Sequence, residues 1–330
     1  MKALVLQEDK SLILTTQEKP VPGPSEVVVA VKASALNHRE IWIQKGLYPG
    51  MKLPCILGAD GAGTIVDLGA EVSADWQDKE VIIYPAYDWG DEEQAPTRQF
   101  RVLGMPDPGT IAKYIKLPVS SLVEKPTYLS WEESAAIPVA GLTAWRALVR
   151  HGRIAPGSKV LITGIGGGVA QAGLTLAKAF GAEIYVTSSS INKIAKAKEL
   201  GATAGVNYKD ADWHLQLKAL SGGIDIVLDS SPSPVLDDYY KFMSYGGRIV
   251  TYGSTGSPKT TISISKFFLR HIQFIGTAMG SPLEFQELIK FMEKHKIRPS
   301  IHQTYPMAKA IEAIKALEQG KQIGKIVLRH

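Results

Sequence analysis

The sequence predicts an α/β protein of two domains, in which a β-rich, barrel-like domain is interrupted by a doubly wound parallel sheet. The chain has 330 residues, more than a single hydrophobic core usually serves. Short apolar runs separated by glycines and prolines fill residues 1–123, whereas strand and helix patterns alternate over residues 124–279. Residues 280–330 are too few to fold alone. We therefore expect one domain from residues 1–123 with 280–330, and the other from residues 124–279.

Charge and hydropathy exclude several classes of function. The 37 Lys and Arg against 32 Asp and Glu give a net charge of +5, and the mean hydropathy is +0.00. The basic residues are scattered, so the sequence predicts neither a nucleic-acid partner nor a membrane surface. No run of roughly 18 apolar residues is present, and the charged Glu8 interrupts the start before a signal-peptide core develops.

The chain has a single cysteine, Cys55. One cysteine cannot form an intramolecular disulfide, and it cannot build a zinc site that needs several thiolates. Cys55 lies between Pro54 and Ile56, so we expect it to pack as a small hydrophobic residue. The sequence therefore predicts a cytoplasmic protein.

The β-rich part is predicted from short apolar runs. Residues 27–31 (VVVAV), 63–66 and 81–84 are typical of strands, and glycines separate them as in a twisted barrel. Residues 85–110 are polar and rich in turn formers, so we expect a surface loop.

The second part begins with a capping box, Ser130 to Glu133, followed by a helical apolar run. Strands and helices then alternate, which indicates a parallel, doubly wound sheet of about six strands. The tail adds two helices, a short extended piece and a last strand, and we expect it to rejoin the first domain. The predicted strands are 159–163, 183–187, 224–228, 248–252, 273–277, 301–305 and 324–328, and the predicted helices are 170–180, 192–200, 283–295 and 308–319.

A glycine-rich loop joins the strand 159–163 to the helix after it. Small residues in a strand–loop–helix turn let the backbone approach a pyrophosphate, whose charge rests on the helix N-terminus. This context predicts a dinucleotide site. The loop residues expected to contact the cofactor are Gly164, Gly166, Gly167, Gly168 and Val169.

The end of the second strand favours NADPH over NADH. An NAD site usually has an acidic residue there, about 20 residues past the glycines, to bind the ribose 2′-hydroxyl. Here Ser188, Ser189 and Ser190 offer hydroxyl groups and Lys193 a positive charge. Alternatively, the serines cap the next helix and Lys193 is a solvated surface residue. Both interpretations can hold at once.

The two halves together resemble the medium-chain dehydrogenase/reductase superfamily, and within it the zinc-independent quinone oxidoreductase branch. The resemblance spans nearly the whole chain and implies a GroES-like catalytic domain, a Rossmann domain that binds NADP(H), and a homodimer paired through strand 273–277. The segments that carry it are 33–49 (ASALNHREIWIQKGLYP), 53–65 (LPCILGADGAGTI), 129–148 (LSWEESAAIPVAGLTAWRAL), the glycine loop, 228–231 (LDSS) and 324–328 (GKIVL).

Many members of the superfamily bind a catalytic zinc ion, but the resemblance implies none here. Asn37 stands at the position of the first ligand, a Cys, and Ala59-Asp60 replace a His-Glu pair. Val139 stands at the third ligand, and residues 85–110 have no cysteine for a structural zinc site. Without a Lewis acid, a quinone or an α,β-unsaturated carbonyl is an easier hydride acceptor than an alcohol is a donor.

The resemblance also assigns site residues. Asn37, Tyr48 and Trp42 are expected at the catalytic centre, with Asn37 facing the nicotinamide and the two aromatic residues lining the substrate site. The role of His38 stays open. Asp60 is expected to be structural, pairing with a base or with backbone amides, although its role is not settled, and no proton donor is marked. Cofactor contacts are also expected at Thr143, Tyr208, Ser230, Gly253, Ser254, Thr255, Thr277, Met279 and Lys325.

The expected function is therefore NADPH-dependent reduction of a small molecule, a quinone or an enone, by direct hydride transfer. Two alternatives remain at this point. One is a zinc-free alcohol or aldehyde dehydrogenase-like oxidoreductase. The other is an NADPH-binding redox sensor with little turnover.

Overall fold

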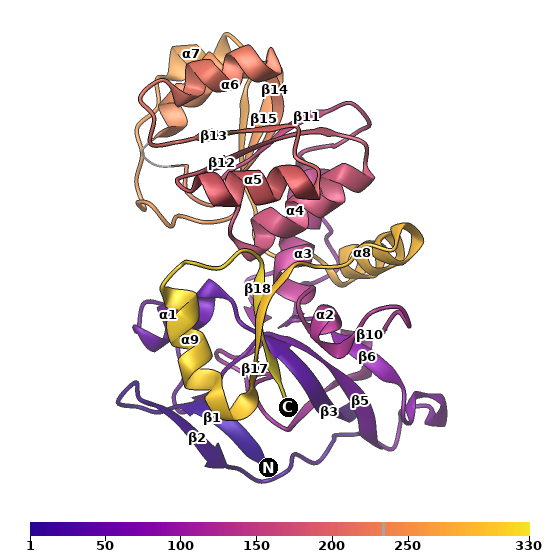
Figure 1. Ribbon diagram of the computed structural model, residues 1–330. Helices are drawn as coiled ribbons and strands as arrows, with labels where there is room; N and C mark the ends of the chain where they lie inside the picture. The colour runs from indigo at the N-terminus through magenta and orange to yellow at the C-terminus, as the bar shows by residue number, and fades with distance from the viewer. Residues whose placement is uncertain (233–234) are drawn as a thin grey trace. The chain divides into compact units, whose positions relative to one another are not determined.

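The computed structural model describes residues 1–232 and 235–330 and divides into two compact units. Unit 1 comprises Met1–Ala140 and Ser281–His330, and unit 2 comprises Gly141–Gly280 (Figure 1). In the described part of the chain, no helix is both long and apolar enough to span a bilayer.

Unit 1 is built on a seven-stranded sheet in which the order β10-β6-β5-β3-β18-β17 is extended by β9, paired with β3. Its strands are β3 (Glu26–Ala35), β5 (Asp60–Leu68), β6 (Glu80–Ile83), β9 (Tyr114–Pro118), β10 (Leu122–Glu124), β17 (Ile301–Pro306) and β18 (Lys325–Arg329). A second sheet has the order β2-β1-β4, from β1 (Lys2–Leu6), β2 (Leu12–Thr16) and β4 (Cys55–Ile56). The predicted loop 85–110 contains only the short pair β7 (Ala86–Tyr87) and β8 (Arg101–Val102).

The tail rejoins unit 1 as the sequence predicts. β18 pairs antiparallel with β3 and parallel with β17 (Figure 1). β3 and β5 pair closely because β5 has glycine at the contact: a Cβ on Gly63 would lie 2.2 Å from the carbonyl oxygen of Ala30. The helical segments of unit 1 are α1 (His38–Gln44), α2 (Trp131–Ala135), α8 (Pro282–His295), α9 (Ala310–Glu318), η1 (Ala74–Trp76), η2 (Val119–Ser121) and η5 (Met307–Lys309).

The first division of the chain lies later than the sequence analysis placed it. We expected the second domain to begin at residue 124, but α2 packs on β3 and β5, and Ala135 joins the buried cluster of Ala33, Ala35 and Ala62. The capping box is present, since Ser130 Oγ accepts the Glu133 N–H at 3.1 Å. The helix is nevertheless shorter than predicted. A new helix, α3 (Pro138–Trp145), begins at its proline and continues as η3 (Arg146–His151), a π-helical segment.

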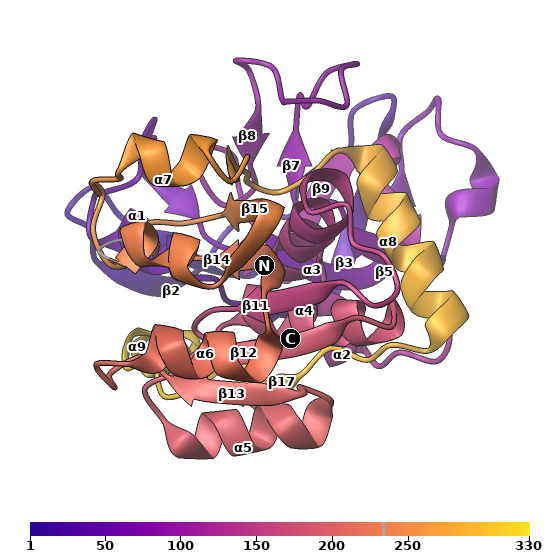
Figure 2. The same cartoon turned by 90° about the horizontal axis from the view of Figure 1, so that it is seen from above.

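Unit 2 is a six-stranded sheet whose paired strands are all parallel, in the order β13-β12-β11-β14-β15-β16. In chain order this is 3-2-1-4-5-6, the order of a doubly wound nucleotide-binding sheet. Figure 2 follows the sheet from β15 through β14, β11 and β12 to β13. Its strands are β11 (Lys159–Ile162), β12 (Glu183–Ser188), β13 (Ala204–Asn207), β14 (Ile224–Asp229), β15 (Met243–Thr251) and β16 (Gln273–Gly276).

The helices of unit 2 follow the strands as predicted, and the buried cluster includes Leu161, Trp213, Tyr239 and Phe242. The sequence analysis expected about six strands but placed only five. β13 reads AGVN, and only its valine is fully buried, so it lacks an apolar pattern. The helical segments are α4 (Gly168–Ala179), α5 (Ile191–Leu200), α6 (Trp213–Ser221), η4 (Val235–Lys241) and α7 (Ile264–Phe268).

Candidate active site

Three strand ends of unit 1 bring an amide, a carboxylate and an ammonium group together. Asn37 lies two residues after the end of β3 and is the N-cap of α1, Asp60 opens β5, and Lys325 opens β18. Ala35 of β3 pairs with Asp60 and also with Val327 of β18. The register of these two ladders therefore sets the three side chains beside one another.

The ammonium group of Lys325 donates to three oxygens. Its Nζ lies 2.6 Å from Asn37 Oδ1, 2.7 Å from the carbonyl oxygen of Leu36 and 2.8 Å from Asp60 Oδ2. Both charged side chains are buried: Lys325 is 5% exposed and Asp60 is 0% exposed. Three acceptors match the three N–H bonds of an ammonium group, so the buried charge is fully paired.

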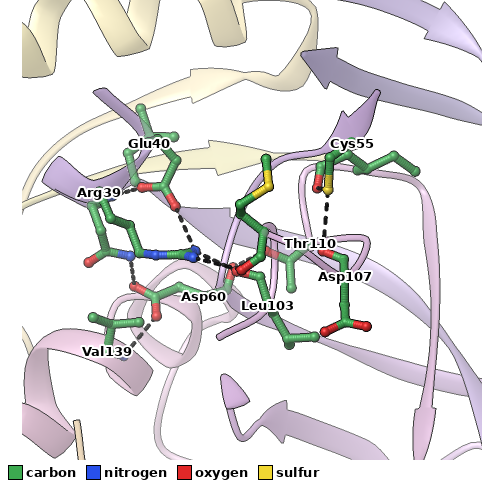
Figure 3. Close-up of polar contacts among 12 residues, drawn as sticks. Arg39, Glu40, Cys55, Asp60, Leu103, Asp107, Thr110 and Val139 are labelled. Atoms are coloured by element: carbon green, nitrogen blue, oxygen red, sulfur yellow. Dashed lines mark hydrogen bonds and ion pairs between the residues drawn. The ribbon is translucent and has the colours of Figure 1, made fainter. Parts of the chain in front are cut away.

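Asp60 is also fully engaged. Its Oδ2 accepts the Nδ2–H of Asn37 at 2.9 Å in addition to the Lys325 ammonium, and its Oδ1 accepts the backbone N–H of Val139 at 2.7 Å. Figure 3 shows the carboxylate of Asp60 turned toward Val139. The carboxylate thereby ties the start of β5 to the start of α3.

Next to this cluster in the sequence, Arg39 and Glu40 fix the start of α1. Glu40 is fully buried, and its Oε2 accepts the backbone N–H of Asn37 at 2.6 Å. The guanidinium group of Arg39 lies 3.6 Å from Glu40 Oε1 and donates to the carbonyl oxygens of Leu103 and Met105 (Figure 3). Burial raises the pKa of Glu40 to about 7, although the Arg39 charge acts in the opposite direction.

The two aromatic residues expected at the catalytic centre lie in different surroundings. Trp42, on α1, is 41% exposed. Tyr48 is half-buried, packs against the main hydrophobic cluster of unit 1, and has the Arg39 guanidinium 4.9 Å from its ring centroid. Tyr48 therefore contributes to packing in unit 1, and its expected role toward a substrate stays a prediction.

The residues at the zinc-ligand positions do not fit a zinc ion. The Asn37 side chain is hydrogen-bonded to Lys325 and Asp60. Ala59, which is buried, and Val139 have aliphatic side chains without an atom that could bind a metal. A divalent cation on Asp60 would be repelled by the ammonium of Lys325 at 2.8 Å. Within residues 1–232 and 235–330, no three His, Cys, Asp or Glu side chains are grouped as metal ligands.

The single cysteine is a buried thiol in this structure. Burial raises the pKa of the Cys55 thiol to about 11, and its Sγ lies 3.4 Å from the carbonyl oxygen of Asp107 (Figure 3). Cys55 packs in the same hydrophobic cluster as Leu4 and Leu57, in agreement with its prediction as a small hydrophobic residue.

In unit 2, the predicted glycine loop lies between the end of β11 and the start of α4. Gly164 has φ +59°, a conformation that favours glycine, and a Cβ on Gly167 would approach only the carbonyl oxygen of Gly164, at 3.6 Å. Gly167 is the N-cap of α4, so no side chain caps the first N–H groups of this 12-residue helix. Gln171 holds the loop by donating to the carbonyl oxygen of Ile165 at 2.7 Å. An open loop with free N–H groups fits a dinucleotide pyrophosphate.

The serines after β12 have the capping role that was the alternative interpretation. Ser190 Oγ accepts the backbone N–H of Lys193 at 3.4 Å as the N-cap of α5, and Ser188 Oγ accepts the N–H of Ser190 at 3.1 Å. Ser189 is exposed, and Tyr208 is 46% exposed beside them, its N–H donating to the Ser188 carbonyl. Burial lowers the pKa of the partly buried Lys193. No acidic residue stands in this segment.

The remaining expected cofactor residues follow strand ends of the same sheet. The N–H of Thr255 donates to the carbonyl oxygen of Ser230 at 3.1 Å, which joins the ends of β14 and β15, and Ser254 is exposed. Thr277 and Met279 follow β16, and Thr277 Oγ1 is buried without a hydrogen-bond partner in the described part of the chain. Two further cofactor residues were expected: Gly253, exposed after β15, and Thr143, buried on α3.

The structure adds a network of which sequence reasoning anticipated only that Asp60 could pair with a base. The ammonium of Lys325 donates to three acceptors within unit 1, and its expected contact with the cofactor stays a prediction. Arg39 and Glu40 were not singled out. The sequence signal for this network is that two apolar strands each begin with a charged residue of opposite sign, Asp60 in β5 and Lys325 in β18.

Two family models match the chain. Residues 23–127 match the alcohol dehydrogenase GroES-like domain, and residues 168–294 match the zinc-binding dehydrogenase model. The chain belongs to the medium-chain dehydrogenase/reductase superfamily. It is an oxidoreductase of that superfamily, with the GroES-like and Rossmann-type units that the sequence predicts.

The most informative relatives cover this chain nearly from end to end. The zinc-type alcohol dehydrogenase-like protein YogA of Leptosphaeria maculans is 37% identical, covering 96% of this chain and 94% of its own length. Acryloyl-coenzyme A reductase of Sulfurisphaera tokodaii is 28% identical over 100% of both chains. A crystal structure of an NAD-dependent alcohol dehydrogenase superposes with a TM-score of 0.94 at 35% identity, over 100% of both chains.

Proposed function

We propose that this protein is a metal-free, NADPH-dependent reductase of α,β-unsaturated carbonyl compounds or quinones, of the zinc-independent branch of its superfamily. The observation that carries the proposal is the Lys325 ammonium bonded to Asp60 Oδ2 and to Oδ1 of Asn37, which the resemblance places at the position of the first zinc ligand. This arrangement leaves a hydrogen-bond donor on Asn37 and no Lewis acid.

In the proposed hydride transfer, the protein binds the substrate and cofactor and stabilises the negative charge that develops on the substrate oxygen. Bound NADPH supplies the hydride. Asn37 Nδ2 donates one hydrogen to Asp60 and keeps a second for a substrate oxygen, on which negative charge develops as hydride reaches the carbon. An amide cannot give up that hydrogen as a proton, so water protonates the product. The exposed indole of Trp42 offers a flat apolar surface for a conjugated substrate.

Cofactor choice rests on the segment after β12. Ser189 is exposed and Lys193 lies in the first turn of α5, so a 2′-phosphate there meets a hydroxyl donor and a positive charge. The glycine loop and the uncapped start of α4 take the pyrophosphate. Tyr208, Ser230 and Thr255, with the other expected residues at the strand ends, complete the proposed NADP(H) site.

The relative named acryloyl-coenzyme A reductase favours an enone-type acceptor, because an acryloyl thioester is an α,β-unsaturated carbonyl compound. The relatives and the solved structure with alcohol dehydrogenase names favour a second candidate, oxidation of an alcohol or reduction of an aldehyde. The two candidates differ in their need for a metal.

Assembly and location complete the proposal. β16 is an edge strand of its sheet, and Phe274 on it is 46% exposed, so pairing of two β16 edges would form a homodimer. Light scattering should then give twice the mass of one chain, and Phe274→Lys should shift it toward the monomer. The single buried cysteine supports a cytoplasmic location.

The test is oxidation of NADPH, followed at 340 nm, with a panel of quinones, enones, enoyl thioesters, alcohols and aldehydes. We expect turnover with unsaturated carbonyls or quinones, preference for NADPH over NADH, and no effect of a chelator. Activity confined to alcohols and aldehydes and lost with chelator would refute the proposal. Tight NADPH binding without turnover on any acceptor would instead support the redox sensor.

A further inference from the structure

The Asn37 side chain is held in one orientation by two opposite charges. Its Oδ1 faces the Lys325 ammonium at 2.6 Å, and its Nδ2 faces the Asp60 carboxylate at 2.9 Å. A 180° flip of the amide would set Nδ2 against the ammonium and Oδ1 against the carboxylate. Both new contacts would be repulsive and largely shielded from water, so the flipped state is strongly disfavoured.

This orientation decides what Asn37 can offer a ligand. The amide has two N–H bonds, and Asp60 takes one of them. The second has no hydrogen-bond partner in the described part of the chain, and Asn37 is only half-buried. Without Lys325 and Asp60, the same side chain would present its carbonyl oxygen as readily as its N–H, and an oxygen would repel a developing oxyanion.

The ammonium also changes the strength of that donor. A cation hydrogen-bonded to an amide oxygen draws electron density from the amide and makes its N–H groups better donors. Lys325 is 5% exposed, so little solvent screens this polarisation. The chain of bonds runs from Lys325 Nζ through Asn37 Oδ1 and Nδ2 to the substrate oxygen that accepts the second N–H.

We propose that Lys325 is the positioning residue for reduction by this protein, acting through the Asn37 amide to stabilise the oxyanion formed on the substrate. Asp60 fixes the same amide from the other side. The proposal rests on the proposed function, since it assigns the source of charge stabilisation in a reaction without a metal. It places a buried lysine in the role that a bound cation has in other oxidoreductases.

The test is a double-mutant cycle of Lys325→Met and Asn37→Ala, measured as kcat with a series of enones whose enolates differ in basicity. Asn37→Ala should lower kcat about 100-fold or more, as removal of one oxyanion donor does. Lys325→Met should lower kcat about tenfold, which is within the range of coupling energies between residues of one hydrogen-bond network. In the Asn37→Ala background, Lys325→Met should have little further effect, because Lys325 then has no amide to act through. The loss in Lys325→Met should also grow as the enolate becomes more basic.

Lys321→Met is the matched control, an exposed lysine four residues away on the same segment, and it should leave every rate unchanged. The double variant Lys325→Met/Asp60→Asn removes both charges, so folding does not suffer from an unpaired buried carboxylate, and it should retain the loss in kcat. Additive losses in the cycle, or an equal loss for every enone, would show that Lys325 is only structural and overturn the proposal.

A second readout does not need turnover. The side-chain amide resonances of Asn37, assigned by their loss in Asn37→Ala, should move in Lys325→Met and stay in place in Lys321→Met. Unchanged resonances would overturn the proposal even in an active enzyme. If the wild type reduces no enone or quinone but the resonances move as expected, the proposed reaction is refuted. The polarisation of the Asn37 amide by Lys325 is then still supported.

Discussion

The backbone N–H of Val139 donates a 2.7 Å hydrogen bond to Oδ1 of Asp60. The two residues are 79 positions apart in the sequence, and the resemblance places both at or beside the expected zinc-ligand positions. Here one is an aliphatic residue that contributes only its backbone, and the other is a carboxylate paired with a lysine. The carboxylate of Asp60 therefore links a buried ion pair to the backbone at the start of α3.

Replacing Asp60 should destabilise the fold strongly. Asp60→Leu leaves the Lys325 ammonium buried without its partner, and breaking a buried pair in this way costs about 3–5 kcal/mol. Urea denaturation should show the loss as a lower midpoint. Asp67→Ala is the matched control, because the Lys19–Asp67 pair is solvent-exposed and should contribute no more than about 1 kcal/mol. Equal midpoints for the two variants would contradict the importance of the buried pair.

Ser189→Asp should reverse the proposed cofactor preference. Ser189 is exposed at the end of β12, so an added carboxylate would repel a 2′-phosphate without disturbing the core. We expect the KM for NADPH to rise about tenfold or more, which corresponds to 1.4 kcal/mol, while the KM for NADH changes little or falls. Ser189→Ala is the control and should have a small effect on both. An equal change for NADPH and NADH would place the 2′-phosphate elsewhere.

Stability should depend on pH through Glu40. Its pKa is raised from 4.5 to about 7 in the folded protein, so between these values the folded state binds more protons than the unfolded state. The free energy of unfolding therefore falls as pH rises from 4.5 through 7. Glu40→Gln removes this contribution while it keeps an oxygen acceptor for the Asn37 N–H.

The measurement is the urea midpoint of the wild type and of Glu40→Gln at pH 5 and pH 8. Burial lowers the pKa of His330 to about 4, which changes stability in the opposite direction, but it does so equally in both proteins. The wild type should therefore lose more stability than the variant between the two pH values. A difference between the proteins that is the same at pH 5 and pH 8 would mean that Glu40 titrates normally.

Much of unit 2 could be predicted from the sequence because its signals are local. The glycine loop between β11 and α4 and the apolar strand runs each depend on neighbouring residues, and the structure contains them nearly as predicted. The sequence analysis did not place β13, because its run AGVN is short and weakly apolar. The sequence analysis also did not predict that unit 1 extends to Ala140, because this boundary depends on α2 packing against strands that are distant in the sequence.

The sequence by itself determined the superfamily, the two kinds of unit and the glycine loop between the first strand and helix of unit 2. Those properties follow from residue identity and local pattern. Only the tertiary structure decided that Lys325 pairs with Asn37 and Asp60. Lys325 meets Asn37 and Asp60 because β18 pairs with β3 and β3 pairs with β5 in one particular register. Such a register is set by long-range packing, because shifting a strand by one residue turns its side chains to the other face of the sheet.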